Sequence, residues 1–83
     1  MANAILMASG LGSRMRPLTN TTPKPLIKVN NTPMIETVIN ALDMAGVEQI
    51  FVVVGYLGEQ FKYLTDKYSN VSIINNNVYE TDN

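Results

Sequence analysis

Residues 4–10 read Ala4-Ile5-Leu6-Met7-Ala8-Ser9-Gly10, an unbroken apolar run that ends in two small residues. Strands with one face in water alternate apolar and polar residues, whereas a continuous apolar run is typical of a strand covered on both faces of a parallel sheet. We therefore expect a buried strand over residues 4–8, followed by a glycine-containing loop at its carboxyl end.

The segment after this strand is rich in turn-forming residues. Residues 9–33 contain prolines at positions 17, 23, 25 and 33, a density that no long regular element survives. A short strand fits residues 26–29, and Asn30-Asn31 would then turn the chain, because asparagine tolerates positive φ.

A helix is predicted next, with start and stop signals at its two ends. Thr32 suits the N-cap, Pro33 the first helical position, and Gly46 the position just after the helix. Glu36 falls in the first turn, where an acidic side chain favours the helix dipole. The predicted apolar face is formed by Ile35, Val38, Leu42 and Ala45.

Two further strands and one helix complete the pattern. Residues 50–54 form a second continuous apolar strand, and residues 71–74 read as a third. Between them, a helix that ends at Asn70 would carry Leu57, Phe61, Leu64 and Tyr68 on one face.

The resulting order is β-loop-α-β-α-β, an α/β pattern. It predicts the N-terminal half of a doubly wound, Rossmann-like parallel sheet with right-handed crossovers. In the usual order of such a half-sheet the first strand keeps one edge that nothing in the chain covers. Because natural proteins avoid open apolar edges, we expect either a truncated chain or a partner that supplies the missing strands.

Composition excludes several kinds of chemistry. The 83 residues include no cysteine and no histidine, so they hold no disulfide, no Cys or His metal site and no histidine base. The net charge of −1 does not suit a nucleic-acid-binding surface. Yet residues 1–35 carry four basic residues and no acidic one, whereas residues 36–83 carry two lysines and seven acidic residues. This skew predicts an anion-binding front half.

The loop after the first strand carries residues that suit phosphate binding. Gly10 and Gly12 let the backbone approach an anion and turn its N–H groups toward it, and Ser13 adds a hydroxyl donor. Arg14 adds a planar guanidinium group suited to phosphate, and Arg16 is open between a phosphate contact and a solvated side chain.

Lys24 is the other candidate for an anion contact. It stands between Pro23 and Pro25, two residues of fixed φ, which would hold the lysine as a positioned charge. Two better-known phosphate loops do not fit this run. The P-loop needs Gly-Lys-Ser/Thr, and the dinucleotide fingerprint needs a third glycine where Met15 stands.

The whole pattern resembles the N-terminal signature of the nucleotidyltransferases that activate sugar 1-phosphates and related phosphomonoesters. The resemblance rests on Gly-x-Gly-x-Arg-Met-x-Pro-Leu-Thr over residues 10–19 and on Pro-Lys-Pro-Leu over residues 23–26. It continues through Pro33-Met34-Ile35-Glu36 into the second strand and covers nearly the whole chain. The short loop and the asparagine-rich end of the third strand are more similar to the phosphocholine cytidylyltransferase branch.

The resemblance implies a role for each matching residue. Family enzymes bind a nucleoside triphosphate over the first βα loop, and residues 1–83 would be the nucleotide-binding N-terminal part of such a domain. Arg14 and Lys24 would be the catalytic cations, Lys24 at the α-phosphate and Arg14 at the leaving phosphates. The other nucleotide-binding residues would be Ala8, Ser9, Gly10, Gly12, Ser13 and Arg16, with Asn77 a candidate for base contact.

The resemblance also implies the substrates and the metal. CTP is the favoured nucleotide, and the acceptor would be phosphocholine or a sugar 1-phosphate. Family enzymes hold Mg²⁺ through an aspartate on a later strand, so we expect the metal ligand outside this chain. The isolated 83-residue piece is therefore expected to lack transferase activity.

Other readings stay open. The chain could be a non-catalytic nucleotide- or phosphate-binding module that assembles with a partner, or a remnant that associates with itself through the open edge of its first strand. No apolar run approaches the ~20 residues of a membrane span, and the N-terminus lacks a signal-peptide pattern. We expect a cytoplasmic protein with small-molecule partners and no membrane contact.

Overall fold

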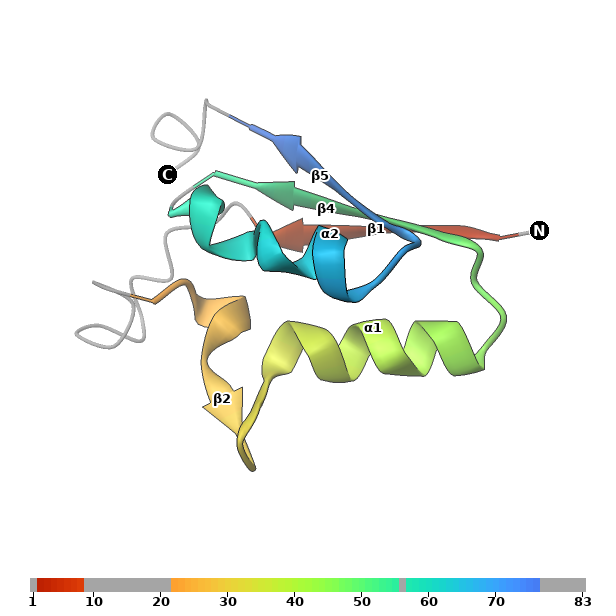
Figure 1. The fold of residues 1–83 in the computed structure, drawn as a ribbon, viewed down its shortest axis with the longest axis horizontal. Coiled ribbons are helices and arrows are strands. Elements are labelled where there is room, and N and C mark those ends of the chain that lie inside the picture. The colour runs from red at the N-terminus through yellow and green to blue at the C-terminus, as the bar shows by residue number, and fades with distance from the viewer. Residues whose placement is uncertain (1, 9–21, 56, 77–83) are drawn as a thin grey trace.

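The computed structural model describes residues 2–8, 22–55 and 57–76 of the 83-residue chain. Five strands, two α-helices and two 3₁₀ turns are found in these ranges (Figure 1). In chain order they are β1 (Asn3–Ala8), the 3₁₀ turn Lys24–Leu26, β2 (Lys28–Val29), β3 (Thr32–Pro33), α1 (Met34–Met44), β4 (Gln49–Val54), the 3₁₀ turn Gly58–Phe61, α2 (Tyr63–Lys67) and β5 (Val71–Asn75).

The main sheet has the order β1-β4-β5, with both pairs of strands parallel. Ile5 pairs with Phe51, which in turn pairs with Ser72, so the carboxyl ends of all three strands meet at one end of the sheet. This confirms the predicted parallel sheet, and β1 is an edge strand of it. The three predicted strands each extend one residue beyond their predicted bounds on one side, at Asn3, Gln49 and Asn75.

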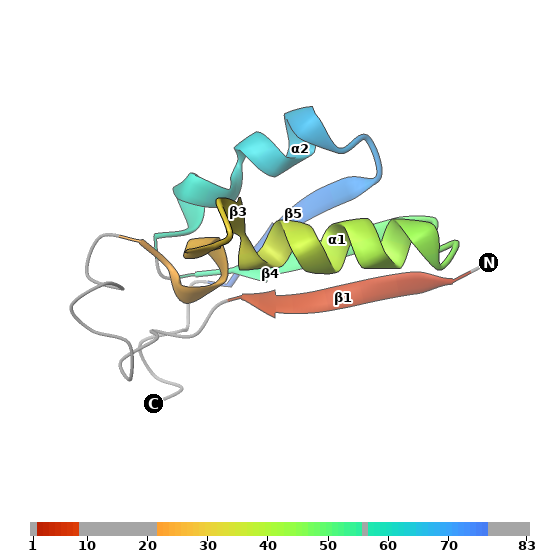
Figure 2. The same ribbon diagram turned by 90° about the horizontal axis from the view of Figure 1, so that it is seen from below.

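Both α-helices cover the same face of this sheet (Figure 2). The covered face buries Ile50, Val52 and Val54 of β4 completely, together with Ala8 at the end of β1. Ile39 of α1 is equally inaccessible and packs into this core.

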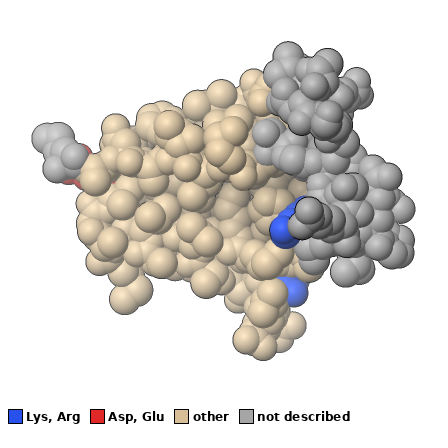
Figure 3. All heavy atoms as spheres, turned by 180° about the vertical axis from the view of Figure 1, so that it is seen from behind, with Lys and Arg blue, Asp and Glu red and all other residues tan. Residues whose placement is uncertain are grey.

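The opposite face of the sheet carries no helix among the described residues. Ile5 and Met7 of β1 are 65% and 68% exposed, and Ile74 of β5 is 46% exposed. The prediction that β1 is covered on both faces was therefore wrong for the described part of the chain. From behind, the described surface is nearly uncharged over its middle and has basic side chains at one end, next to the grey residues (Figure 3).

The start of α1 differs from the prediction because a hairpin takes the predicted capping residues. Thr32–Pro33 forms β3 and pairs antiparallel with β2, and Pro33 has an extended ψ of 137°. The helix therefore begins at Met34, and no side chain caps it by a hydrogen bond. Asn30 and Asn31 do have positive φ, 54° and 67°, as predicted for a tight two-residue turn.

Two of the four residues predicted for the apolar face of α1, Ile35 and Leu42, pack on the core, whereas Val38 and Ala45 are exposed. Val38 was predicted to face the core and is 44% exposed, whereas the following residue, Ile39, is fully buried. Ile35 is buried as predicted, and Gly46 stops the helix with a φ of +87°. Val38 instead lines the open groove beside β1.

The second helical segment is broken where the prediction had one helix. Leu57 adopts a left-handed φ of 54°, which no α-helix can include, and the 3₁₀ turn Gly58–Phe61 follows it. α2 then covers only Tyr63–Lys67, with Tyr68 as its extended C-cap. Phe61 and Leu64 are fully buried as predicted. A Cβ at Gly58 would lie 2.8 Å from Val54 Cγ2, so a glycine is needed for this close approach to β4.

Candidate functional site

The described residues include two of the predicted site residues, Ala8 and Lys24. Seven others lie outside the described residues: Ser9, Gly10, Gly12, Ser13, Arg14, Arg16 and Asn77. Their assignments remain predictions.

Ala8 and Lys24 line the same groove. It has a volume of about 410 Å³ and runs along the open flank of β1, between that strand and the start of α1. Its other lining residues are Ile5, Leu6, Met7, Pro25, Met34, Ile35 and Val38. Ala8 is the last residue of β1, so the groove reaches the carboxyl end of the strand, where ligands of doubly wound sheets bind.

Lys24 is held at this end by its backbone. Pro23 is fully buried with φ −57°, and its carbonyl accepts a hydrogen bond from the Leu26 N–H at 2.9 Å. The carbonyl of Lys24 accepts one from the Ile27 N–H at 3.1 Å. The Lys24 side chain itself is exposed. The 3₁₀ turn Lys24–Leu26 thus places Lys24 at this end of the sheet with an exposed side chain, and its role as a positioned charge stays a prediction.

A second hollow lies at the carboxyl ends of β4 and β5. Its volume is about 470 Å³, and its lining includes Gly55, Lys62 and Asn75. The Asn76 N–H donates a 2.6 Å hydrogen bond to the Val54 carbonyl, which ties the chain after β5 to the end of β4. The asparagine run therefore begins at the same end of the sheet as Ala8 and Lys24.

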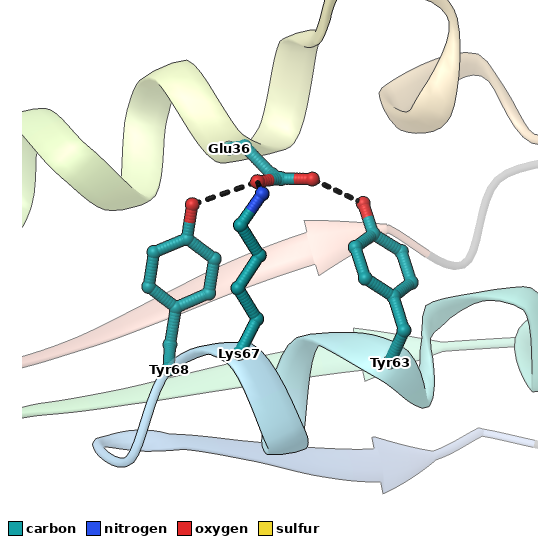
Figure 4. A network of polar contacts seen from close by, with 4 residues as sticks. All are labelled: Glu36, Tyr63, Lys67 and Tyr68. Carbon is teal, nitrogen blue, oxygen red and sulfur yellow. Dashed lines mark hydrogen bonds and ion pairs between the residues drawn. The ribbon is translucent and has the colours of Figure 1, made fainter.

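The structure also contains a polar cluster that the sequence prediction missed, here called the Glu36 clamp: Glu36, Tyr63, Lys67 and Tyr68 (Figure 4). Glu36 lies in the first turn of α1 and is only 3% exposed. Its Oε2 accepts a hydrogen bond from the Tyr63 hydroxyl at 2.6 Å, and its Oε1 accepts one from the Tyr68 hydroxyl at 2.7 Å. Lys67 Nζ lies 2.7 Å from Oε1.

The clamp shifts the ionisation of all its members. Burial alone would raise the pKa of Glu36, but hydrogen bonds from Lys67, Tyr63 and Tyr68 outweigh it and hold that pKa below its ordinary value. Burial and the Glu36 carboxylate together raise the pKa of Tyr63 and of Tyr68. The hydrogen bond to Glu36 raises the pKa of Lys67. At neutral pH the clamp therefore contains an ionised Glu36 carboxylate, two neutral tyrosine hydroxyls and a charged Lys67 ammonium.

The stability that the clamp contributes should depend on pH at both ends of the range. Because the folded pKa of Glu36 is lowered, its contribution is present above the unfolded value of about 4.3 and is lost as the pH falls through the folded value. Because the folded pKa values of both tyrosines are raised, their contribution is present below about pH 10 and is lost as the pH rises through the folded values.

We therefore expect Glu36→Gln to cost about 1–3 kcal/mol of unfolding free energy near pH 7. The difference between wild type and variant should shrink below about pH 4 and above about pH 10. Urea unfolding across this range measures it. A difference that stays constant down to about pH 3 would contradict the assigned charge state of Glu36.

The described ranges contain no group of three His, Cys, Asp or Glu side chains able to hold a metal ion. Nor do they contain a helix long and apolar enough to cross a membrane. Within residues 2–8, 22–55 and 57–76, the groove with Lys24 is a candidate anion site because an exposed lysine lines it. No Asp, Glu, His or Cys side chain is among the described residues that line it.

Comparison with known proteins gives a family likeness over nearly the whole chain. The profile of a family described as nucleotidyl transferase matches residues 3–83. The chain is 69% identical over 77 residues to a 2-aminoethylphosphonate cytidylyltransferase of Lancefieldella rimae, covering 93% of this chain and 31% of that protein. It is 49% identical over 76 residues to a choline-phosphate cytidylyltransferase of Streptococcus pneumoniae, covering 92% of this chain and 33% of that protein.

Solved structures share the fold. A CTP:phosphocholine cytidylyltransferase from Streptococcus pneumoniae superposes with a TM-score of 0.91 at 47% identity, over 96% of this chain and 35% of that one. An inositol-1-phosphate CTP transferase from T. maritima superposes with a TM-score of 0.74 at 28% identity, over 96% of this chain and 34% of that one. The chain therefore spans about a third of the length of these relatives.

Proposed function

Because this chain belongs to the nucleotidyl transferase family, we propose that it supplies the nucleoside-triphosphate half of a cytidylyltransferase active site. In this proposal residues 1–83 are the nucleotide-binding part of a longer domain, and the acceptor half is formed by other residues. The observation that carries it is the placement of Lys24 beside Ala8, on one groove at the carboxyl end of β1.

The proposed reaction is nucleotidyl transfer with release of pyrophosphate. A phosphate or phosphonate oxygen of the acceptor attacks the α-phosphorus of CTP, a new P–O bond forms, and the bond from the α-phosphorus to the bridging oxygen breaks. The electron pair of that bond leaves with pyrophosphate. Charge spreads over the phosphate oxygens during this step, so positioning and charge stabilisation supply most of the catalysis.

The proposed roles follow from this charge. Lys24 neutralises charge at the α-phosphate, and its exposed side chain on a hydrogen-bonded 3₁₀ turn supports that role. Arg14, with Gly12 and Ser13, would hold the β- and γ-phosphates that leave.

The nucleoside itself would be held at the carboxyl end of β1. We propose that Ala8, Ser9 and Gly10 contact base and ribose, with Asn77 at the base and Arg16 a further phosphate contact. The hollow at the ends of β4 and β5, with Asn75 in its lining, supports a base contact near this region.

The acceptor is proposed to be a small amine-bearing phosphate or phosphonate. Two of the similar proteins are named for 2-aminoethylphosphonate and for choline phosphate, which share a two-carbon unit between a cationic nitrogen and an acidic phosphorus group. A sugar 1-phosphate is the remaining acceptor class. Mg²⁺ would be held by an aspartate outside this chain.

The proposal also covers partners and location. We propose a cytoplasmic protein that acts on small molecules and contacts neither nucleic acid nor membrane. The position of β1 at the edge of the described sheet supports pairing of that strand with further strands, supplied by the same protein or by a second copy.

Titration of the intact gene product with nucleotides tests the proposal. With Mg²⁺ present, calorimetry should show CTP binding at least about tenfold more tightly than UTP, dTTP, GTP or ATP. Pyrophosphate should be released when 2-aminoethylphosphonate or phosphocholine is added with CTP. Tight CTP binding without pyrophosphate release from any acceptor would instead support the non-catalytic binding module. The 83-residue piece assayed alone should release none.

A further inference from the structure

The Glu36 clamp lies close in the chain to the segment that carries Lys24. The Met34 N–H, two residues before Glu36, donates a 3.1 Å hydrogen bond to the Ile27 carbonyl. The Ile27 N–H in turn donates to the Lys24 carbonyl at 3.1 Å. Two backbone hydrogen bonds therefore connect Lys24 to the first turn of α1.

The other side of the clamp is fixed to the core. Tyr63 and Lys67 belong to α2, where Leu64 is fully buried, and the Tyr68 N–H donates to the Leu64 carbonyl at 2.9 Å. α2 packs on β5 of the main sheet. The clamp therefore ties the start of α1 to an element that the sheet itself holds in place (Figure 4).

The first turn of α1 needs such a tie. No side chain caps it by a hydrogen bond, and Met34 and Val38 face the open flank along β1, where Val38 is 44% exposed. The buried apolar side chain of this turn is Ile35. The three hydroxyl and ammonium contacts of the Glu36 carboxylate supply the side-chain restraint that a capping residue would otherwise give there.

We propose that Glu36 is a positioning residue for Lys24: it fixes the first turn of α1 against α2 and, through Met34 and Ile27, the backbone that presents the Lys24 ammonium. This inference rests on the proposed function of Lys24. Glu36 itself does not touch the nucleotide in this proposal. Its loss misplaces Lys24, and misplacement of a charge-stabilising group by about 1 Å can cost 100-fold in rate.

The test uses the intact protein and two matched substitutions on α1. Glu36→Gln removes the charge of the clamp at the start of the helix. The control, Asp43→Asn, removes an exposed carboxylate near its end, where Asp43 Oδ1 accepts a 2.7 Å hydrogen bond from Asn70. Both changes weaken one link between α1 and a later segment, but only the first lies next to the Lys24 segment.

The rate constants are measured at a temperature well below the thermal unfolding midpoint of each variant. Glu36→Gln should lower kcat by about 10–100-fold with KM for CTP changed less than about threefold. Asp43→Asn should leave kcat and KM for CTP within about twofold of the wild-type values. The double variant Lys24→Ala/Glu36→Gln should be no slower than Lys24→Ala alone, because two residues that act through one group are not additive. Multiplicative losses would overturn the inference.

Hydrogen exchange supplies a readout that does not depend on activity. The amides of Leu26, Ile27 and Met34 should exchange at least about tenfold faster in Glu36→Gln and at the wild-type rate in Asp43→Asn. Unchanged exchange at these amides would overturn the inference whatever the activity. A wild-type protein that binds CTP and forms no product would overturn the proposed function, and the exchange result would still decide the role of the clamp.

Discussion

Lys24→Ala will lower kcat for nucleotidyl transfer by about 10²–10³-fold, the usual loss when one preorganised charge-stabilising donor is removed. The reason is the position of Lys24, which lines the same groove as Ala8. Its backbone is held because the carbonyls of Pro23 and Lys24 accept hydrogen bonds from the Leu26 and Ile27 N–H groups. Because the ammonium acts on charge that grows in the transition state, KM for CTP should change much less than kcat. Steady-state pyrophosphate release by the intact protein measures both constants.

Lys28 is the matched control for this change. It is another exposed lysine four residues further along, on β2, and it lines a separate hollow with Glu36 and Lys67. Lys28→Ala should keep kcat within about twofold of wild type. Lys24→Arg keeps the charge with a different shape and should recover only part of the loss. A Lys24→Ala variant within about threefold of wild type would remove Lys24 from the catalytic groups.

Phe61→Ala will cost about 3–5 kcal/mol of unfolding free energy, the largest stability loss that we expect from one substitution in this chain. Phe61 is fully buried in the core at the end of the 3₁₀ turn Gly58–Phe61. Truncation removes its transfer free energy and leaves a cavity beneath a segment that the left-handed Leu57 and the close-packed Gly58 already constrain. Urea unfolding of the intact protein measures the loss.

Two variants separate cavity formation from a general effect of mutation in this segment. Phe61→Leu keeps much of the volume and should cost less than about 2 kcal/mol. Lys62→Ala, at the exposed neighbouring residue, should stay within about 0.5 kcal/mol of wild type. A Phe61→Ala loss below about 1 kcal/mol would mean that the helical layer is not held on the sheet through this side chain.

The strands and their order could be predicted because their signals are local and redundant. Residues 50–54 are an unbroken apolar run, and alternation with helical segments leaves a parallel sheet as the natural solution. The start of α1 differs from its prediction. Thr32 and Pro33 have the composition of a helix start, but pairing with β2 holds Pro33 in an extended conformation, and the helix begins one residue later.

Burial of particular residues needed the tertiary structure. Helical spacing predicted Val38 on the core face, but the packing of α1 on the sheet buries Ile39 and leaves Val38 44% exposed. Ile5 and Met7 have the apolar character of covered residues but lie on a face that carries no described helix. An apolar side chain favours burial, but whether it is buried depends on which elements pack against it.

The sequence alone determined the family and the parallel sheet, because each depends on residues that are adjacent or regularly spaced in the chain. Only the tertiary structure revealed the Glu36 clamp. Its two hydrogen bonds join residues that are 27 and 32 positions apart in the chain. A glutamate in the first turn of a helix ordinarily has its side chain in solvent. It becomes a buried, three-contact carboxylate here because packing on the sheet brings α2 against the start of α1.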